Sequence, residues 1–186
     1  GGVRGRGNER HELAARRARL LDVPAARQYG ALHHAVEFGH EVGAKPKQAR
    51  LFGQDLVLYR DSKGDVVCHS DICIHRGASL EYGIIADRGI RCCYHGWQFD
   101  VQGHCLHQPC EPGGGRAREA KRQPWYPVQE QYGLIWAYMG PPERKPALPR
   151  YECLEQLGEG EFLEADDSSI GGGGPQIIPC NWLQHY

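Results

Sequence analysis

Two short stretches of the sequence each combine one cysteine with one histidine. The first contains Cys73 and His75 in a C-x-H spacing, and the second contains Cys92 and His95 in a C-x2-H spacing. Two thiolates can bind one iron while two neutral imidazoles bind a second iron, as in a [2Fe–2S] centre with unequal irons. Zinc accepts the same four ligands, but common zinc modules pair Cys with Cys and His with His along the chain. The mixed stretches therefore favour the iron–sulfur cluster, with a zinc site as the alternative.

The residues that flank these ligands extend the pattern. Here the chain resembles the Rieske domain of the large subunits of ring-hydroxylating oxygenases. The resemblance implies that Cys73 and Cys92 bind the inner iron and that His75 and His95 bind the outer iron. It also implies that no catalytic residue lies in this chain. The matching positions are Asp71, Cys73, His75, Arg76, Gly77, Ala78, Leu80 and, after the second cysteine pair, residues 94–99.

Several neighbours of the ligands are expected to tune the cluster. A glycine near a ligand lets the backbone approach a sulfide and donate a hydrogen bond, which favours the reduced state. The Tyr94 hydroxyl could donate a further hydrogen bond, and the Trp97 ring is expected to pack as a wall of the site. The complete set of expected neighbours is Arg76, Gly77, Tyr94, Gly96 and Trp97.

The chain also departs from the family pattern in places. Ile74 and Cys93 occupy positions where the family often has proline, and the spare thiol of Cys93 is expected to point away from the cluster. Rieske proteins of respiratory complexes carry one extra cysteine in each loop, where this chain has Ala78 and Tyr94. The resemblance is therefore to the lower-potential oxygenase and ferredoxin type.

Short apolar segments separated by tight turns predict a mainly β fold. We expect strands at residues 49–53, 55–60, 65–69, 126–130 and 133–139, with a hairpin over residues 97–106. Because His69 lies on one of these strands, we expect it to be a surface or hydrogen-bonded histidine and not a further ligand. The fold class is thus a small antiparallel Rieske iron–sulfur domain followed by the beginning of an α+β catalytic domain.

Changes in composition divide the chain into four zones. Residues 1–34 are expected to form a poorly ordered basic extension, and residues 35–140 the Rieske domain. Residues 141–150 contain four prolines and predict a stiff linker. Residues 151–186 are expected to be a truncated start of the catalytic domain, with a strand at 161–166 and a helix beginning near Asn181. Because the chain opens at Gly1 and stops inside an expected element, we expect it to be a fragment of a longer protein.

The overall composition limits the functional classes. The 22 basic and 23 acidic residues give a net charge of −1, which does not indicate nucleic-acid binding. The sequence shows neither an apolar run of transmembrane length nor the apolar core of a signal peptide, so we expect a cytoplasmic protein without a membrane partner. Eight cysteines would otherwise suggest a secreted disulfide framework, but two of them already belong to the cluster motif, so a reducing cytoplasm is favoured. The cysteines expected to be buried or neutral are Cys68, Cys105, Cys110, Cys153 and Cys180.

The resemblance implies an electron-accepting function. A reductase or ferredoxin would reduce the cluster, and a mononuclear Fe(II) in a missing C-terminal part would use O2 to hydroxylate or demethylate a small, often aromatic, organic substrate. The full-length protein is expected to be a homo-oligomer. The alternative is a stand-alone Rieske ferredoxin that only carries electrons. The prolines after residue 140 and the sequence Cys180-Asn181-Trp182 favour the oxygenase.

Overall fold

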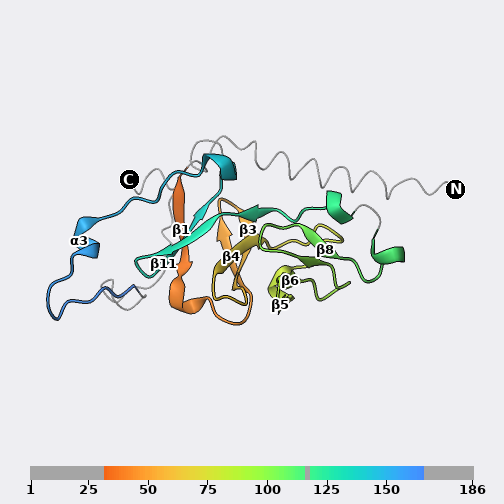
Figure 1. Cartoon of the computed structure of the whole chain (residues 1–186), viewed down its shortest axis with the longest axis horizontal. Helices are drawn as coiled ribbons and strands as arrows, with labels where there is room; N and C mark the ends of the chain where they lie inside the picture. The colour runs from red at the N-terminus through yellow and green to blue at the C-terminus, as the bar shows by residue number, and fades with distance from the viewer. Residues whose placement is uncertain (1–31, 116–117, 166–186) are drawn as a thin grey trace.

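The computed structural model describes residues 32–115 and 118–165, which fold into three antiparallel sheets (Figure 1). This agrees with the mainly β class predicted from the sequence. The first sheet has the strand order β1-β11-β10. Its strands are β1 (His33–Phe38), β10 (Val128–Gln131) and β11 (Leu134–Tyr138). Strand β1 was not expected, and it begins inside the region assigned to the basic extension.

The second sheet has the order β2-β3-β4-β9 and forms the centre of the molecule. A tight turn at Phe52 and Gly53, both with positive φ, joins the first two strands, so β2 ends earlier than the sequence predicted. Strand β3 is buried on both faces, because its alternate side chains enter two separate apolar clusters. The strands are β2 (Lys47–Leu51), β3 (Gln54–Arg60), β4 (Val66–Ser70) and β9 (Trp125–Tyr126).

The third sheet is smaller, and its strands are short, with the order β5-β6-β7-β8. The second Cys/His stretch connects β6 to β7, and the first stretch connects β4 to the 3-10 turn η2 (Leu80–Tyr82). Gly89 must be glycine here, because its φ is +111° and a Cβ atom would lie 2.1 Å from the Phe99 carbonyl oxygen. The strands are β5 (Ile84–Ala86), β6 (Gly89–Arg91), β7 (Gln98–Phe99) and β8 (Cys105–His107).

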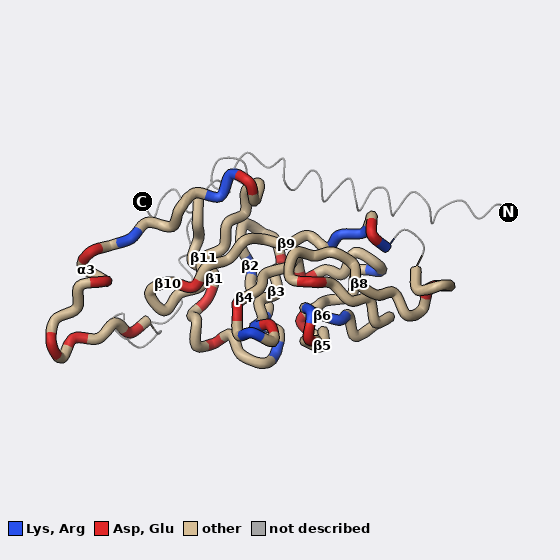
Figure 2. The backbone as a smooth tube through the Cα atoms, in the orientation of Figure 1, with Lys and Arg blue, Asp and Glu red and all other residues tan. Residues whose placement is uncertain are grey.

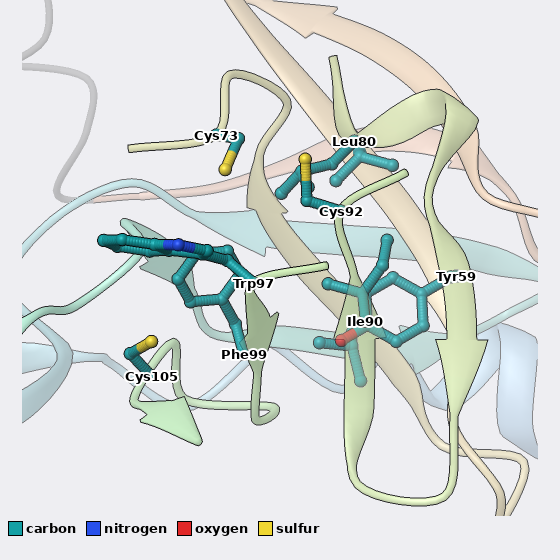
Figure 3. Packing of buried hydrophobic residues seen from close by; sticks show 10 residues of the cluster. Tyr59, Cys73, Leu80, Ile90, Cys92, Trp97, Phe99 and Cys105 are labelled. Atoms are coloured by element: carbon teal, nitrogen blue, oxygen red, sulfur yellow. The ribbon is translucent and has the colours of Figure 1, made fainter. Parts of the chain in front are cut away.

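Two apolar clusters pack on opposite sides of β3. Val57 and Tyr59 enter the first cluster, which also contains both Cys73 and Cys92 (Figure 3). Leu56 and Leu58 enter the second cluster, together with Ile135 of β11. The candidate ligand sulfurs therefore belong to the core of the domain and are fixed by its packing.

The remaining described segments carry little regular structure. They form short 3-10 turns and one short helix, α3 (Glu152–Glu155). The expected strand at 161–166 is wrong for residues 161–165, which have no regular structure, because no neighbouring strand among the described residues pairs with them. The predictions for residues 1–31, for Cys180 and for the helix near Asn181 lie outside the described residues. The 3-10 turns are η1 (Gly39–Glu41), η3 (Pro112–Gly114), η4 (Arg118–Ala120) and η5 (Pro142–Arg144).

Charged residues of both signs are spread over these elements (Figure 2). Arg60 is the most extensively bonded cation among them, since its guanidinium donates to the carbonyls of Val42, Gly64 and Gly39 and to both carboxylate oxygens of Glu130. These bonds tie β3 to the first sheet. In the part of the chain that is described, no helix is long and apolar enough to cross a membrane.

Candidate metal centre

The first Cys/His loop is closed by two backbone hydrogen bonds. The N–H of Cys73 donates to the Ala78 carbonyl at 2.8 Å, and the N–H of Gly77 donates to the Cys73 carbonyl at 2.9 Å. Gly77 has a φ of +78°, a left-handed conformation that glycine adopts without strain. The loop therefore turns back on itself directly after the cysteine.

The second loop has the same backbone frame. The N–H of Cys92 donates to the Trp97 carbonyl at 2.8 Å, and the N–H of Gly96 donates to the Cys92 carbonyl at 3.0 Å. Gly96 has a φ of +71°, and a Cβ atom there would lie 2.8 Å from Cγ of Pro109, which packs over this turn. Two segments with different ligand spacing thus form equivalent turns.

The two loops place like ligands together. The rings of His75 and His95 lie with their centroids 4.7 Å apart and their planes at 75°. The thiols of Cys73 and Cys92 share a hydrogen bond, and both lie in the apolar cluster that also contains Trp97 (Figure 3). The structure consequently forms one sulfur pair and one imidazole pair from residues that alternate along the chain.

The sulfur pair is prepared to carry negative charge. In both loops the sulfur accepts hydrogen bonds from the backbone N–H groups two and three residues further along the chain. The hydrogen bond with Cys73 lowers the pKa of Cys92 to about 6, and the same shared proton raises the pKa of Cys73. Because the thiolate is the form that binds metal, one sulfur of the pair is ready to do so near neutral pH.

The available donor atoms fit a [2Fe–2S] cluster. Cys73 and Cys92 are 1% and 4% exposed, and Nδ1 of His95 is buried without a hydrogen-bond partner among the described residues. Buried polar atoms normally have a partner, so this nitrogen indicates a missing one. Two separate ligand pairs, one of sulfur and one of imidazole, are what two unequal irons need.

The imidazole pair lies between two aromatic rings. The ring of Trp97 stacks on His75 at a centroid distance of 4.4 Å and an interplanar angle of 7°. Tyr94 lies on the other side, 3.8 Å from the ring of His95, and is 63% exposed. Nε2 of His75 is 3.9 Å from a carboxylate oxygen of Glu111. Arg76, another expected neighbour of the cluster, is exposed. Cys93, whose thiol was expected to point away from the cluster, is also exposed.

Asp71 contributes more to the site than its place in the motif suggested. The carboxylate is buried, and it accepts hydrogen bonds from the Ser79 hydroxyl at 3.0 Å, the Glu81 N–H at 2.8 Å and the Gln48 side chain at 3.0 Å. These bonds connect the base of the first loop to η2 and to β2. Sequence reasoning also missed Gln123, a buried residue far along the chain that contacts the same loop.

The sequence left His69 as either a surface or a hydrogen-bonded histidine, and the structure shows that the surface alternative is wrong. His69 is fully buried, because β4 is covered on both faces, and its ring lies 5.7 Å from that of Tyr59. Burial lowers the pKa of His69 to about 4, and nearby backbone groups and Asp100 offset only part of this effect. His69 is therefore a neutral core residue at physiological pH.

Comparison with known proteins agrees with this geometry. Residues 33–129 match the family model described as the Rieske [2Fe-2S] domain. Phenoxybenzoate dioxygenase subunit alpha from Ectopseudomonas oleovorans is 52% identical over 155 residues, which cover 81% of this chain and 38% of that protein. The oxygenase subunit of phthalate 4,5-dioxygenase from Pseudomonas putida is 37% identical over 144 residues, covering 77% of this chain and 30% of that protein.

A solved structure shows the same fold. The crystal structure of dicamba monooxygenase superposes with a TM-score of 0.60 and 33% identity, covering 66% of this chain and 39% of that protein. The chain thus spans between 30% and 39% of the length of these three relatives. The family match covers more than half of the 186 residues and includes both Cys/His loops. With the sulfur pair and the imidazole pair in place, the chain belongs to the Rieske [2Fe–2S] domain family.

Proposed function

We propose that this chain is the electron-accepting domain of a Rieske-type oxygenase subunit, in which Cys73, His75, Cys92 and His95 hold the cluster. The observation that carries the proposal is the pairing of the two sulfurs and of the two imidazoles across loops of equal backbone shape. When bound, a [2Fe–2S] cluster accepts and releases one electron at a time.

The four ligands are unequally buried, which indicates the side of the cluster that an electron-transfer partner can reach. The two cysteines lie in the core, whereas the side chain of His75 is 16% exposed and its neighbour Tyr94 is largely exposed. An electron partner can therefore approach most closely on the histidine side. The backbone N–H groups that bond to the sulfurs stabilise added negative charge, which favours the reduced state.

The partners in this proposal follow from the relatives. Their names describe dioxygenase, monooxygenase and O-demethylase oxygenase subunits. We therefore assign a reductase or ferredoxin as donor, a mononuclear iron as acceptor, and O2 with a small organic substrate as reactants. The acceptor iron would lie in the part that corresponds to the rest of the relatives' length. In the same proposal, residues 35–140 form the electron-transfer domain, residues 141–150 the linker and residues 151–186 the start of the catalytic domain.

The proposal extends to assembly and compartment. We assign the full-length protein to a homo-oligomer in the cytoplasm. Support for the compartment comes from the cysteines of the described residues, which are all free thiols and so suit a reducing environment. The relatives named above are oxygenase subunits, so the oxygenase is favoured over the stand-alone ferredoxin.

Metal analysis of the purified chain tests the cluster assignment. We expect iron and acid-labile sulfide in equal amounts, together with a visible absorption band that disappears in Cys73→Ala. The exposed Cys93 provides a matched control, since Cys93→Ala should keep the band. A colourless protein with stoichiometric zinc after expression with ample iron would contradict the proposal.

A second experiment tests the oxygenase assignment. The full-length protein, supplied with a reductase and a panel of aromatic carboxylates that includes phenoxybenzoate, should consume O2 and form an oxygenated or demethylated product. A reducible cluster without O2 consumption on any substrate would instead support the ferredoxin.

A further inference from the structure

Gln123 is a buried glutamine whose side chain holds both peptide groups of Cys73. It is 0% exposed and lies just before β9, 49 residues after the loop that it contacts. Its Oε1 accepts a hydrogen bond from the N–H of Ile74 at 3.0 Å, and its Nε2 donates to the carbonyl of Ile72 at 2.9 Å. These two groups belong to the peptide bonds on either side of Cys73. The amide thus spans the cysteine from one peptide to the next.

The same amide also reaches the end of the preceding strand. Its second N–H donates to the carbonyl of Ser70 at 2.8 Å, so both amide hydrogens and the amide oxygen are bonded. The loop's own turn occupies the N–H and carbonyl of Cys73 itself, through Ala78 and Gly77. All four polar groups of the two peptides that flank Cys73 are therefore fixed, and with them the direction of its side chain.

The backbone of Gln123 is itself rigidly held. Its N–H donates to the Gly103 carbonyl at 2.7 Å, and a Cβ atom on Gly103 would lie 1.9 Å from the Gln123 carbonyl oxygen. Gly103 lies in the turn between β7 and β8, and the carbonyl of the adjacent Pro124 accepts from the N–H of Ser70 at 2.9 Å. Gln123 consequently links the first cluster loop to the third sheet through hydrogen bonds at its backbone and its side chain.

We infer that Gln123 is a positioning residue for Cys73, which secures the cluster and raises its reduction potential. This inference rests on the proposed role of Cys73 as a ligand. The sulfur accepts two backbone N–H groups from its own loop, and their alignment depends on how firmly the peptides at Cys73 are held. If the peptides that flank Cys73 are held less firmly, the hydrogen bonds to its sulfur weaken. The reduced cluster is then less stabilised, and its reduction potential falls. Loss of such supporting contacts typically weakens metal binding roughly 10- to 100-fold.

The test uses the 186-residue chain with its cluster and the variant Gln123→Met, which keeps the side-chain length but loses all three hydrogen bonds. We expect iron to pass to a chelator roughly 10 to 100 times faster than in the wild type. We also expect a more negative reduction potential and altered EPR g values for the reduced cluster.

Two control variants separate positioning from general destabilisation. Ile135→Ala removes a fully buried side chain from the second apolar cluster, which contains neither candidate sulfur. It should lower the melting temperature without moving the potential or the g values. Gln129→Met changes an exposed glutamine on β10 and should alter none of these quantities.

A third variant covers the case in which Gln123→Met does not fold. Gln123→Asn keeps a neutral amide but is one methylene group shorter, so it cannot reach Ile74, Ser70 and Ile72 as Gln123 does, and its iron release should be faster than that of the wild type. The inference is overturned if the potential and g values of the Gln123 variants equal those of the wild type, or if iron release is no faster than in Ile135→Ala. A wild-type chain without any iron–sulfur absorption would instead refute the proposed function itself.

Discussion

The buried histidine on β4 makes the stability of this domain depend on pH. The pKa of His69 is 6.5 in the unfolded chain and about 4 in the folded chain, because burial disfavours the charged imidazolium. Between these values the unfolded chain binds more protons, so the stability of the fold rises with pH. The contribution is complete above pH 6.5 and is lost as the pH falls toward 4.

The size of this effect follows from the two pKa values. One pKa unit corresponds to about 1.4 kcal/mol, so His69 lowers the free energy of unfolding by about 2 kcal/mol between pH 8 and pH 5. The loss reaches about 3 kcal/mol below pH 4. Domains of this kind are stable by only about 5–15 kcal/mol, so a single histidine has a measurable influence.

The variant His69→Leu should remove this pH dependence. Urea unfolding followed by circular dichroism at pH 8 and pH 5 gives the loss of stability for the wild type and for the variant. We expect the variant to lose about 2 kcal/mol less than the wild type. Because the cluster and its ligands are common to both proteins, their own pH dependence cancels in this difference. His107→Leu, at an exposed position on β8, is the matched control and should behave like the wild type. Equal losses in the wild type and His69→Leu would refute the argument.

Two further predictions concern the cluster loops and the sheet beneath them. Cys92→Ala should lose the visible absorption and the EPR signal while Cys93→Ala retains both, because Cys92 lies in the core and Cys93 is exposed; the opposite result would mean that the ligand register is wrong. Gly89→Ala should lower the free energy of unfolding by at least about 3 kcal/mol, since a left-handed residue is strained and its Cβ atom would meet the Phe99 carbonyl at 2.1 Å. Gly64→Ala, which has a φ of +87° but open space around it, should lower it by only about 1–2 kcal/mol. Similar urea midpoints for the two glycine variants would show that the close approach at Gly89 relaxes.

The sequence alone predicted the family and the main features of the fold. The Cys/His spacings are local, and each loop closes on itself within a few residues, so the chemistry could be inferred without tertiary information. The strands around residues 55–60 and 133–139 were also predicted, because runs of apolar residues between turns specify buried strands wherever they pack.

Other features depended on contacts between residues that are distant in sequence. Strand β1 forms because it pairs with β11, about a hundred residues later, and its sequence HHAVEF shows no regular alternation of polar and apolar residues. His69 is buried because sheets cover both faces of β4, which a single alternating strand cannot indicate. Gln123 and Asp71 are polar residues whose hydrogen bonds hold the first loop, yet polar residues in sequence normally suggest the surface.

One physical cause separates the features that the sequence predicted from those that only the structure showed. Metal-ligand spacing and turn chemistry act over a few residues, so the sequence by itself determined which side chains are candidates for the cluster. The pairing of sulfur with sulfur and imidazole with imidazole required two loops from different sheets to face each other. The family resemblance implied which ligands pair, but only the tertiary structure places them side by side, because their contact depends on how the apolar core brings the loop after β4 and the loop after β6 together.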